Sequence, residues 1–149
     1  MDLTVQSVLF QQDDECNGLY IIQRGHLAGY LYDRNDKMIN LNGLQQTPLV
    51  GEVSFFLKTK RTASIYCKSS IRSFFLDIRS KKTFHDLCPK LHKRMRNQIF
   101  TYQDECLEYK VKILKESVFY FHNVEREALV ELSFQMKILA FQKDNQVVK

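Results

Sequence analysis

The sequence lacks long apolar segments, paired cysteines and any arrangement of residues typical of an active site. No run approaches the about 18 apolar residues of a membrane-spanning helix, so we expect no transmembrane span. The 4 cysteines lie far apart and form no CxxC pair, which favours free thiols in the reducing cytoplasm. The 4 histidines are scattered, and none pairs with a cysteine in a pattern that indicates nucleophilic catalysis. We therefore expect a cytoplasmic protein that is not an enzyme.

One short segment has a spacing that resembles a metal site. His85, Cys88 and His92 are separated by two and three residues, but Pro89 interrupts a helix there. A fourth ligand is not evident, although structural zinc sites use four. We therefore expect no metal and no cofactor.

The positive charge of the chain is concentrated in one segment. The formal net charge is +5, and most of the excess lies in residues 81–96, where Asp86 is the one acid. Such a patch can contact nucleic acid, acidic lipid or an acidic partner. Aromatic residues do not alternate with these cations as base-stacking surfaces require, so we expect no nucleic-acid partner. A solvated helix face is the simpler interpretation. The cations are Lys81, Lys82, Lys90, Lys93, Arg94 and Arg96.

The first half of the chain reads as a series of short strands divided by polar turns. Short strands at intervals of about eight to twelve residues are typical of a sandwich or a jelly-roll barrel. Polar loops are expected between them, at 11–18, 33–37 and 42–43. The predicted strands are residues 4–10, 19–23, 26–32, 38–41, 65–68 and 73–78.

The apolar period changes to that of helices after Ser80. A short helix is predicted from Ser80 to Cys88, and Pro89 can begin a second helix. Apolar residues then recur at steps of three and four, which predicts one long amphipathic helix over about 90–115. The fold class expected is mainly β with C-terminal helices, namely a jelly-roll-like barrel followed by a short helix and a long helix.

The stretch 50–65 combines the residue types that a sugar-phosphate pocket needs. Gly51 allows the backbone close to a ligand, and the Glu52 carboxylate can accept a hydrogen bond from a ribose hydroxyl. About nine residues of short turn are expected before Arg61, whose planar fork of donors suits phosphate oxygens. The small residues Thr62 and Ala63 leave backbone N–H groups open to the same anion.

This stretch resembles the phosphate-binding cassette of cyclic nucleotide-binding domains, roughly F-G-E-[LIV]-[AS]-L-[LF]-x-x-x-x-R-[AT]-A-[TS]-V. Two departures from the family lie in the x-x-x-x stretch, where Lys58 replaces the usual glycine and Lys60 the usual proline. These departures predict a less tightly fixed turn and bear on affinity more than on fold. The matching residues are Gly51, Glu52, Val53, Ser54, Arg61, Thr62, Ala63, Ser64 and Ile65.

A second, upstream segment supports the same resemblance. The segment with Gly18, Tyr20 and Gly25 resembles the family's G-x-x-[LM]-Y-[IV]-[IL]-x-x-G pattern at the expected distance from the cassette, with Tyr20 and Gly25 in register and Gly18 two residues nearer to the tyrosine. An ordinary β-hairpin would explain this segment alone. The barrel followed by helices is also the family's architecture, in which the last helix closes over the base.

The resemblance implies a regulatory module whose ligand is cAMP or cGMP. Glu52 would hold the ribose hydroxyl, Arg61 the cyclic phosphate, and the backbone around Gly51, Val53, Thr62 and Ala63 would complete the cradle. Thr62 does not separate cAMP from cGMP receptors. The partner would be an effector domain of a larger protein, either a cation channel at the cytosolic face of a membrane or a kinase regulatory protein.

Two other functions remain open on the sequence. A degenerate domain of the same fold would serve as a protein-interaction scaffold without nucleotide, which Lys58 and Lys60 favour and which Glu52 and Arg61 oppose. A transcriptional regulator is less favoured, because residues 117–149 lack a clear helix-turn-helix.

The expected organisation is one domain followed by a fragment. Residues 1–116 would form the cyclic nucleotide-binding-like domain without the N-terminal helical lead-in of the family. Residues 117–149 resemble the helical lead-in and first strand of a possible second such domain, with residues 141–148 as the strand. A C-terminal helical subdomain that packs on the barrel is the alternative.

Overall fold

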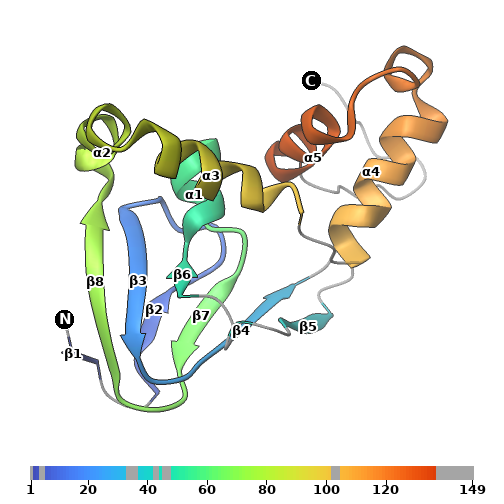
Figure 1. The fold of residues 1–149 in the computed structure, drawn as a ribbon. Coiled ribbons are helices and arrows are strands. Elements are labelled where there is room, and N and C mark those ends of the chain that lie inside the picture. The colour runs from blue at the N-terminus through green and yellow to red at the C-terminus, as the bar shows by residue number, and fades with distance from the viewer. Residues whose placement is uncertain are drawn as a thin grey trace, which may run out of the picture.

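The computed structural model describes residues 2–3, 6–32, 37–41, 44, 48–101 and 105–136. Two four-stranded antiparallel sheets form its β part, and helices follow them (Figure 1). This confirms the predicted fold class. The turn at 42–43 and most of that at 33–37 lie outside the described residues. One sheet has the order β1 (Asp2–Leu3), β8 (Ile71–Asp77), β3 (Gly18–Arg24) and β6 (Leu49–Val50); the other has β2 (Val8–Phe10), β7 (Ser64–Cys67), β4 (Leu27–Tyr32) and β5 (Met38–Leu41).

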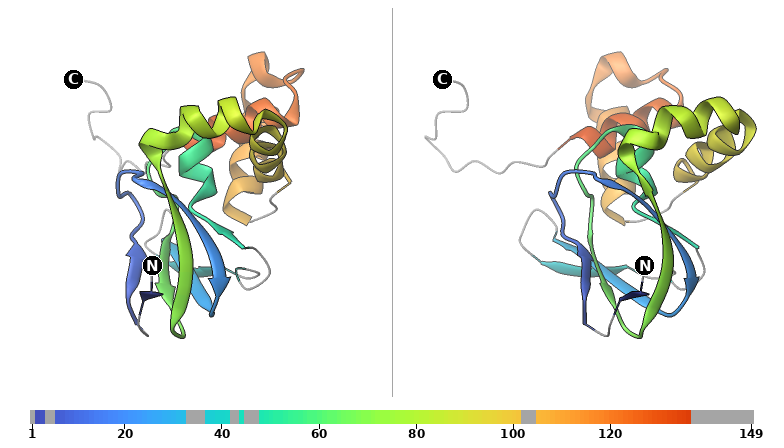
Figure 2. Two further views of the ribbon diagram at one scale, coloured as in Figure 1. Left: turned by 60° about the vertical axis from the view of Figure 1, so that its left-hand side comes forward. Right: turned by 90° about the vertical axis from the view of Figure 1, so that its left-hand side faces the viewer.

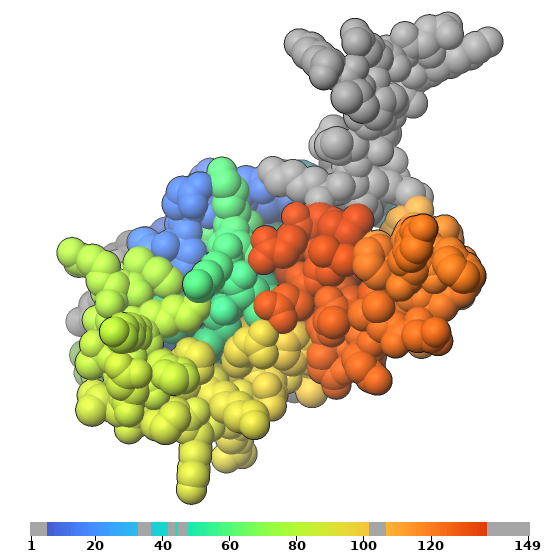
Figure 3. Space-filling view, turned by 90° about the horizontal axis from the view of Figure 1, so that it is seen from above, coloured from blue at the N-terminus to red at the C-terminus, as the bar shows by residue number. Residues whose placement is uncertain are grey.

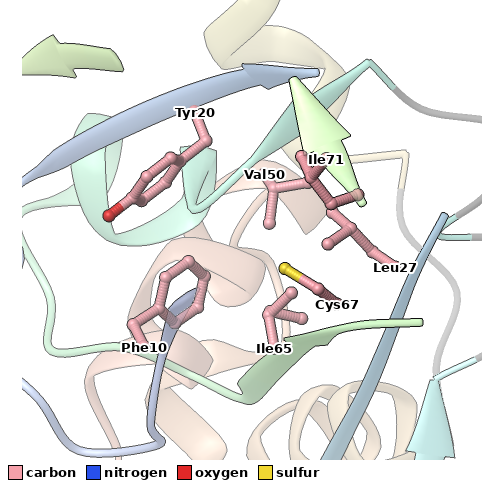
Figure 4. Close-up of a cluster of buried hydrophobic side chains, with 7 residues drawn as sticks. All are labelled: Phe10, Tyr20, Leu27, Val50, Ile65, Cys67 and Ile71. Carbon is pink, nitrogen blue, oxygen red and sulfur yellow. The ribbon is translucent and has the colours of Figure 1, made fainter. Parts of the chain in front are cut away.

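The two sheets enclose an apolar core because alternate residues of each strand point inward. On β3, Tyr20 faces this core and lies opposite Phe75 of β8, with ring centroids 4.9 Å apart. On β4, the inward Gly29 lies opposite Ile65 of β7. Figure 4 shows side chains from both sheets meeting in this space: Phe10, Tyr20, Leu27, Val50, Ile65, Cys67 and Ile71.

A helical layer covers one end of the sheets (Figures 1 and 2). Helix α2 begins after Ser80 and α3 begins at Pro89, as predicted, because proline fits the first turn of a helix. None of the helices among the described residues is long and apolar enough to cross a membrane. The helical elements are α1 (Glu52–Leu57), η2 (Ile78–Ser80), α2 (Lys81–Leu87), α3 (Pro89–Ile99), α4 (Glu105–Ser117), η3 (Phe119–Phe121) and α5 (Arg126–Gln135).

The prediction of one continuous helix over 90–115 was wrong in the middle of that range. Helix α3 ends at Ile99, where the N–H groups of Phe100 and Thr101 bond the carbonyls three residues back, Asn97 and Gln98. The Thr101 hydroxyl also donates to the Gln98 carbonyl at 2.7 Å. A side chain that takes a backbone carbonyl competes with the next helical bond, which favours the end of the helix together with the tighter backbone bonds of Phe100 and Thr101. Helix α4 begins at Glu105.

The C-terminal helices form a second apolar cluster and also contact the rest of the molecule. Leu107, Val111, Leu114, Leu129 and Val130 are buried between α4 and α5. From α5, Phe134 packs against the cluster around α1, and Arg96 of α3 pairs with Glu131 at 2.8 Å. The predicted strand at 141–148 lies outside the described residues, so a second domain stays a prediction.

Candidate functional site

The cassette residues form a short helix between two left-handed residues. Residues 52–57 are α1, so the turn predicted between Glu52 and Arg61 is wrong over this part. Gly51 precedes the helix with φ 84° and Lys58 follows it with φ 57°. Val53, Phe55, Phe56 and Leu57 are buried on all sides of this helix, against β3 and α3. Because every residue of α1 after Glu52 is buried, the helix has no polar stripe that would mark it in the sequence.

Gly51 and Arg61 are held together at the start of α1. The Arg61 Nη1 donates to the Gly51 carbonyl at 3.1 Å and to the Ser54 hydroxyl at 2.8 Å. A Cβ on residue 51 would lie 2.3 Å from that nitrogen, and the positive φ would strain any other residue. Glycine at this position is therefore required by the arginine as well as by the backbone.

The other side of the Arg61 guanidinium faces the end of the loop that leads into β3. Its Nη2 donates to Asn17 Oδ1 at 2.8 Å and to the Gly18 carbonyl at 2.7 Å. Its Cζ lies 4.1 Å from the centroid of the Phe10 ring, a cation–π contact. Only 1% of the residue is exposed. Burial lowers the pKa of Arg61, while nearby groups that include the Glu52 carboxylate act in the opposite direction.

One donor of this buried guanidinium has no acceptor in the part of the chain that the structure describes. The Nε–H of Arg61 is buried without a hydrogen-bond acceptor among the described residues, whereas both terminal nitrogens have acceptors. A buried donor without an acceptor costs free energy and is rare in proteins. Nε–H and one Nη2–H share the edge of the guanidinium that binds carboxylate or phosphate oxygens side-on. An anion that approached this edge would satisfy the unpaired donor.

The other predicted site residues lie around this arginine to different degrees. Glu52 is half-buried in the first turn of α1, and its charge acts on Arg61. Thr62 is half-buried and Ala63 is buried, directly after the arginine. The side chain of Val53 packs in the core around α1. Only its backbone N–H is therefore available to a ligand.

Four residues that contact the Arg61 guanidinium were not predicted as site residues, namely Phe10, Asn17, Gly18 and Ser54. Ser54 lies inside the cassette pattern and could have been included from it. Phe10 and Asn17 are distant in sequence from Arg61, and no local spacing connects them to it. Among the described residues, no cluster of three or more histidine, cysteine, aspartate or glutamate side chains could hold a metal ion.

The C-terminal end of α1 is held by two side chains from other helices. Lys81 Nζ of α2 donates to the Phe55 carbonyl and, at 3.1 Å, to the Phe56 carbonyl. Gln135 Nε2 of α5 donates to the Leu57 carbonyl at 3.0 Å. These bonds satisfy carbonyl groups that the last turn of a helix leaves without partners. The cassette helix is thereby bonded directly to α2 and α5.

A model of the cyclic nucleotide-binding domain matches residues 2–88, more than half of the chain. The chain belongs to the cyclic nucleotide-binding domain family. The match covers both sheets, α1 and α2, and includes every residue that contacts the Arg61 guanidinium. The matched range ends before α3. Comparison with curated proteins gave no match.

Solved structures of this family have the same fold at low identity. The regulatory domain of Toxoplasma gondii PKA with cAMP is 16% identical, with TM-score 0.53, over 89% of this chain and 45% of that one. The cAMP-bound PfPKA-R is 16% identical, with TM-score 0.52, over 89% and 42%. The N-terminal domain of a transcriptional regulator from Streptomyces coelicolor A3(2) is 19% identical, with TM-score 0.52, over 70% and 80%. The chain thus spans less than half of either PKA structure.

Proposed function

We propose that this cyclic nucleotide-binding domain binds cAMP or cGMP at the cassette and acts as a regulatory module rather than an enzyme. Arg61 would bind the cyclic phosphate and Glu52 the ribose hydroxyl, with the backbone of Gly51, Val53, Thr62 and Ala63 completing the site. The observation that carries the proposal is the buried Nε–H of Arg61, which lacks an acceptor among the described residues.

Phosphate binding in this proposal requires an exchange of hydrogen bonds at Arg61. A side-on phosphate takes Nε–H and one Nη2–H, but Nη2 is engaged by Asn17 Oδ1 and the Gly18 carbonyl. The carbonyl belongs to strand β3 and is fixed by the sheet, whereas the Asn17 side chain can rotate. We infer that Asn17 releases Arg61 when the nucleotide binds.

The bonds at the end of α1 offer a route from the site to other elements of the domain. A change at the start of α1 is transmitted to α2 and α5 through Lys81 and Gln135. We propose a cytoplasmic host, either a cation channel, with the domain at the cytosolic face of its membrane, or a kinase regulatory protein. No metal or other cofactor enters the proposal.

A specific observation also supports a second candidate function. Both terminal nitrogens of Arg61 are already satisfied within the protein, so this arginine stabilises the fold without any ligand. A scaffold that has lost nucleotide binding would keep it for that reason. The two candidates differ in whether the Nε–H ever receives an acceptor.

Calorimetric titration of cAMP and cGMP into the full chain tests the proposal. Glu52→Ala should weaken binding by about 10- to 100-fold, because a hydrogen bond to a charged group contributes about 1.5–3 kcal/mol. Glu15→Ala removes a similar acid from the loop before β3, where Glu15 is exposed and pairs with Lys60 at 3.1 Å, and should leave affinity unchanged. Arg61→Lys keeps the charge and loses the side-on fork.

The outcome distinguishes the two candidates. Binding that Glu52→Ala and Arg61→Lys weaken, and that Glu15→Ala does not, supports the receptor. A folded wild-type chain that gives neither heat nor a thermal shift with either nucleotide rejects the receptor and leaves the scaffold.

A further inference from the structure

The exposed corner between α2 and α3 has no role in the proposed nucleotide site. We call it the corner surface and define it by exposed residues on both sides of the break at Cys88. It lies at the end of the helical layer opposite α4, away from the sheets (Figures 1 and 2). Viewed from above, the α2 and α3 side chains project outward there (Figure 3). The residues are Lys82, Leu87, Cys88, Pro89, Lys90, Leu91, Lys93 and Arg94.

Two leucines of the corner surface are unusually exposed. Leu87, the last residue of α2, is 76% exposed, and Leu91, in the first turn of α3, is 49% exposed. The apolar positions that pack against the α1 cluster from this region are Phe84 and Met95, so the leucines are not needed to attach the helices. Both lie beside the break at Cys88, where the chain passes from α2 to α3.

The cations beside these leucines are available to a partner. Among the described residues, Lys82, Lys90, Lys93 and Arg94 form no ion pair. The other two cations of 81–96 are engaged, Lys81 with carbonyls of α1 and Arg96 with Glu131. Asp86, the one acid of the segment, lies 3.2 Å from His85.

We propose that the corner surface binds anionic lipid at a membrane surface. Exposed leucines flanked by lysine and arginine are the combination that inserts an apolar edge between lipid headgroups while the cations contact them. Nucleic acid would use the cations but give no favourable place to Leu87 and Leu91. A helical peptide lays its apolar face into a hydrophobic groove on its partner, whereas here the exposed leucines are themselves the apolar element that needs a place to insert.

A second exposed apolar site in the molecule shows what the corner surface adds. Phe119 and Tyr120 of η3 are 77% and 87% exposed. The formal charges around them in the sequence are balanced, because Lys112, Lys115 and Arg126 stand among Glu116, Glu125 and Glu127. Without an excess of cations this site offers anionic lipid no net electrostatic attraction, so exposure alone does not predict lipid binding there. The corner surface differs because its exposed leucines stand beside an excess of cations.

Co-sedimentation of the full chain with vesicles tests the proposal independently of nucleotide binding. Binding to vesicles of phosphatidylcholine with phosphatidylserine is expected, with little binding to phosphatidylcholine alone and a steep loss as salt rises. Lys90→Glu/Arg94→Glu should weaken it by about 25-fold or more, because each cation strengthens binding about fivefold. Leu87→Ser/Leu91→Ser should weaken it by about tenfold or more through lost apolar burial.

Matched variants at the other end of the helical layer serve as controls. Lys112→Glu/Lys115→Glu makes the same charge change on exposed residues of α4, and Phe119→Ser/Tyr120→Ser removes comparable exposed apolar area. Both should bind vesicles like the wild type, and thermal melting should show all four variants folded.

Three results would overturn the proposal. They are no binding of the folded wild type to anionic vesicles at low salt, equal loss in the control variants, and full binding by the leucine variant. The last result, together with tight binding of single-stranded RNA or an acidic peptide, would make the surface a general polyanion site rather than a lipid site.

Discussion

Replacing Asn17 with alanine should strengthen cyclic nucleotide binding while weakening the fold. Asn17 Oδ1 accepts from Arg61 Nη2 at 2.8 Å, and the arginine is 1% exposed. Asn17→Ala therefore leaves a buried, charged donor without its acceptor, at a cost of about 1–3 kcal/mol in the free energy of unfolding. The Asn17 backbone carbonyl, which accepts from Ile78 N at 2.9 Å, is kept.

A bound phosphate supplies the acceptor that the substitution removed. The cost of the unpaired Nη2 donor is then present in the free variant but absent from its nucleotide complex. Nucleotide binding to the variant is therefore more favourable by that free energy. We expect about 1–2 kcal/mol, which corresponds to about 5- to 30-fold tighter binding of the cyclic nucleotide. The nucleotide should also raise the melting temperature of Asn17→Ala more than that of the wild type, because tighter binding shifts unfolding further.

Calorimetry and urea unfolding on the same samples measure both halves of this prediction. Asn97→Ala is the matched control, because Asn97 is an exposed asparagine on α3 whose side chain has no contact at the site. Equal affinity of Asn17→Ala and wild type would mean that Nη2 is not released on binding. Weaker affinity would mean that the amide itself contacts the nucleotide. Either result refutes the reasoning.

Three further predictions concern stability. Lys58→Gly should raise the free energy of unfolding by about 0.5–1 kcal/mol in chemical denaturation, because Lys58 has φ 57° and glycine adopts this left-handed conformation without strain. An unchanged free energy of unfolding would show that contacts of the Lys58 side chain offset the strain. Burial, with the charges of His85, Lys81 and Arg96, lowers the pKa of His92. The unfolded chain therefore binds the proton more readily, so the free energy of unfolding should fall as the pH drops through about 6.5. Between pH 7.5 and 5, the free energy of unfolding of His92→Gln should depend less steeply on pH than that of the wild type. An equally steep dependence would assign the effect to another group. Gln135→Ala should cost about 1 kcal/mol by leaving the Leu57 carbonyl without its bond; a circular-dichroism melt identical to wild type would show that water replaces it.

The strands were predictable because their signals are local. Alternating apolar residues and polar turns around β3, β4 and β5 placed each of these strands to within one residue. Short β1 and β6 have two residues each, too few for a period to be seen. The break after Ile99 was missed because the apolar steps continue across Phe100, while a threonine hydroxyl ends the helix.

The site was predictable in its residue types and less so in its geometry. The spacing from Gly51 and Glu52 to Arg61 identified the cassette. That α1 is a helix could not be predicted, because an apolar run buried on all sides is equally consistent with a strand or a helix. The partners of Arg61 across the chain, Phe10 and Asn17, depend on how strands β2 and β3 are placed, which no local pattern encodes.

The bonds at the end of α1 have a thermodynamic consequence for the C-terminal region. Gln135 joins the cassette helix to α5, which lies beyond the matched range of 2–88. Free-energy coupling between two sites is reciprocal. If nucleotide binding shifts α1 and thereby changes the affinity of α5 for another molecule, that molecule must change the nucleotide affinity by the same factor. An effector bound at α5 would then set the nucleotide concentration at which the site is half occupied.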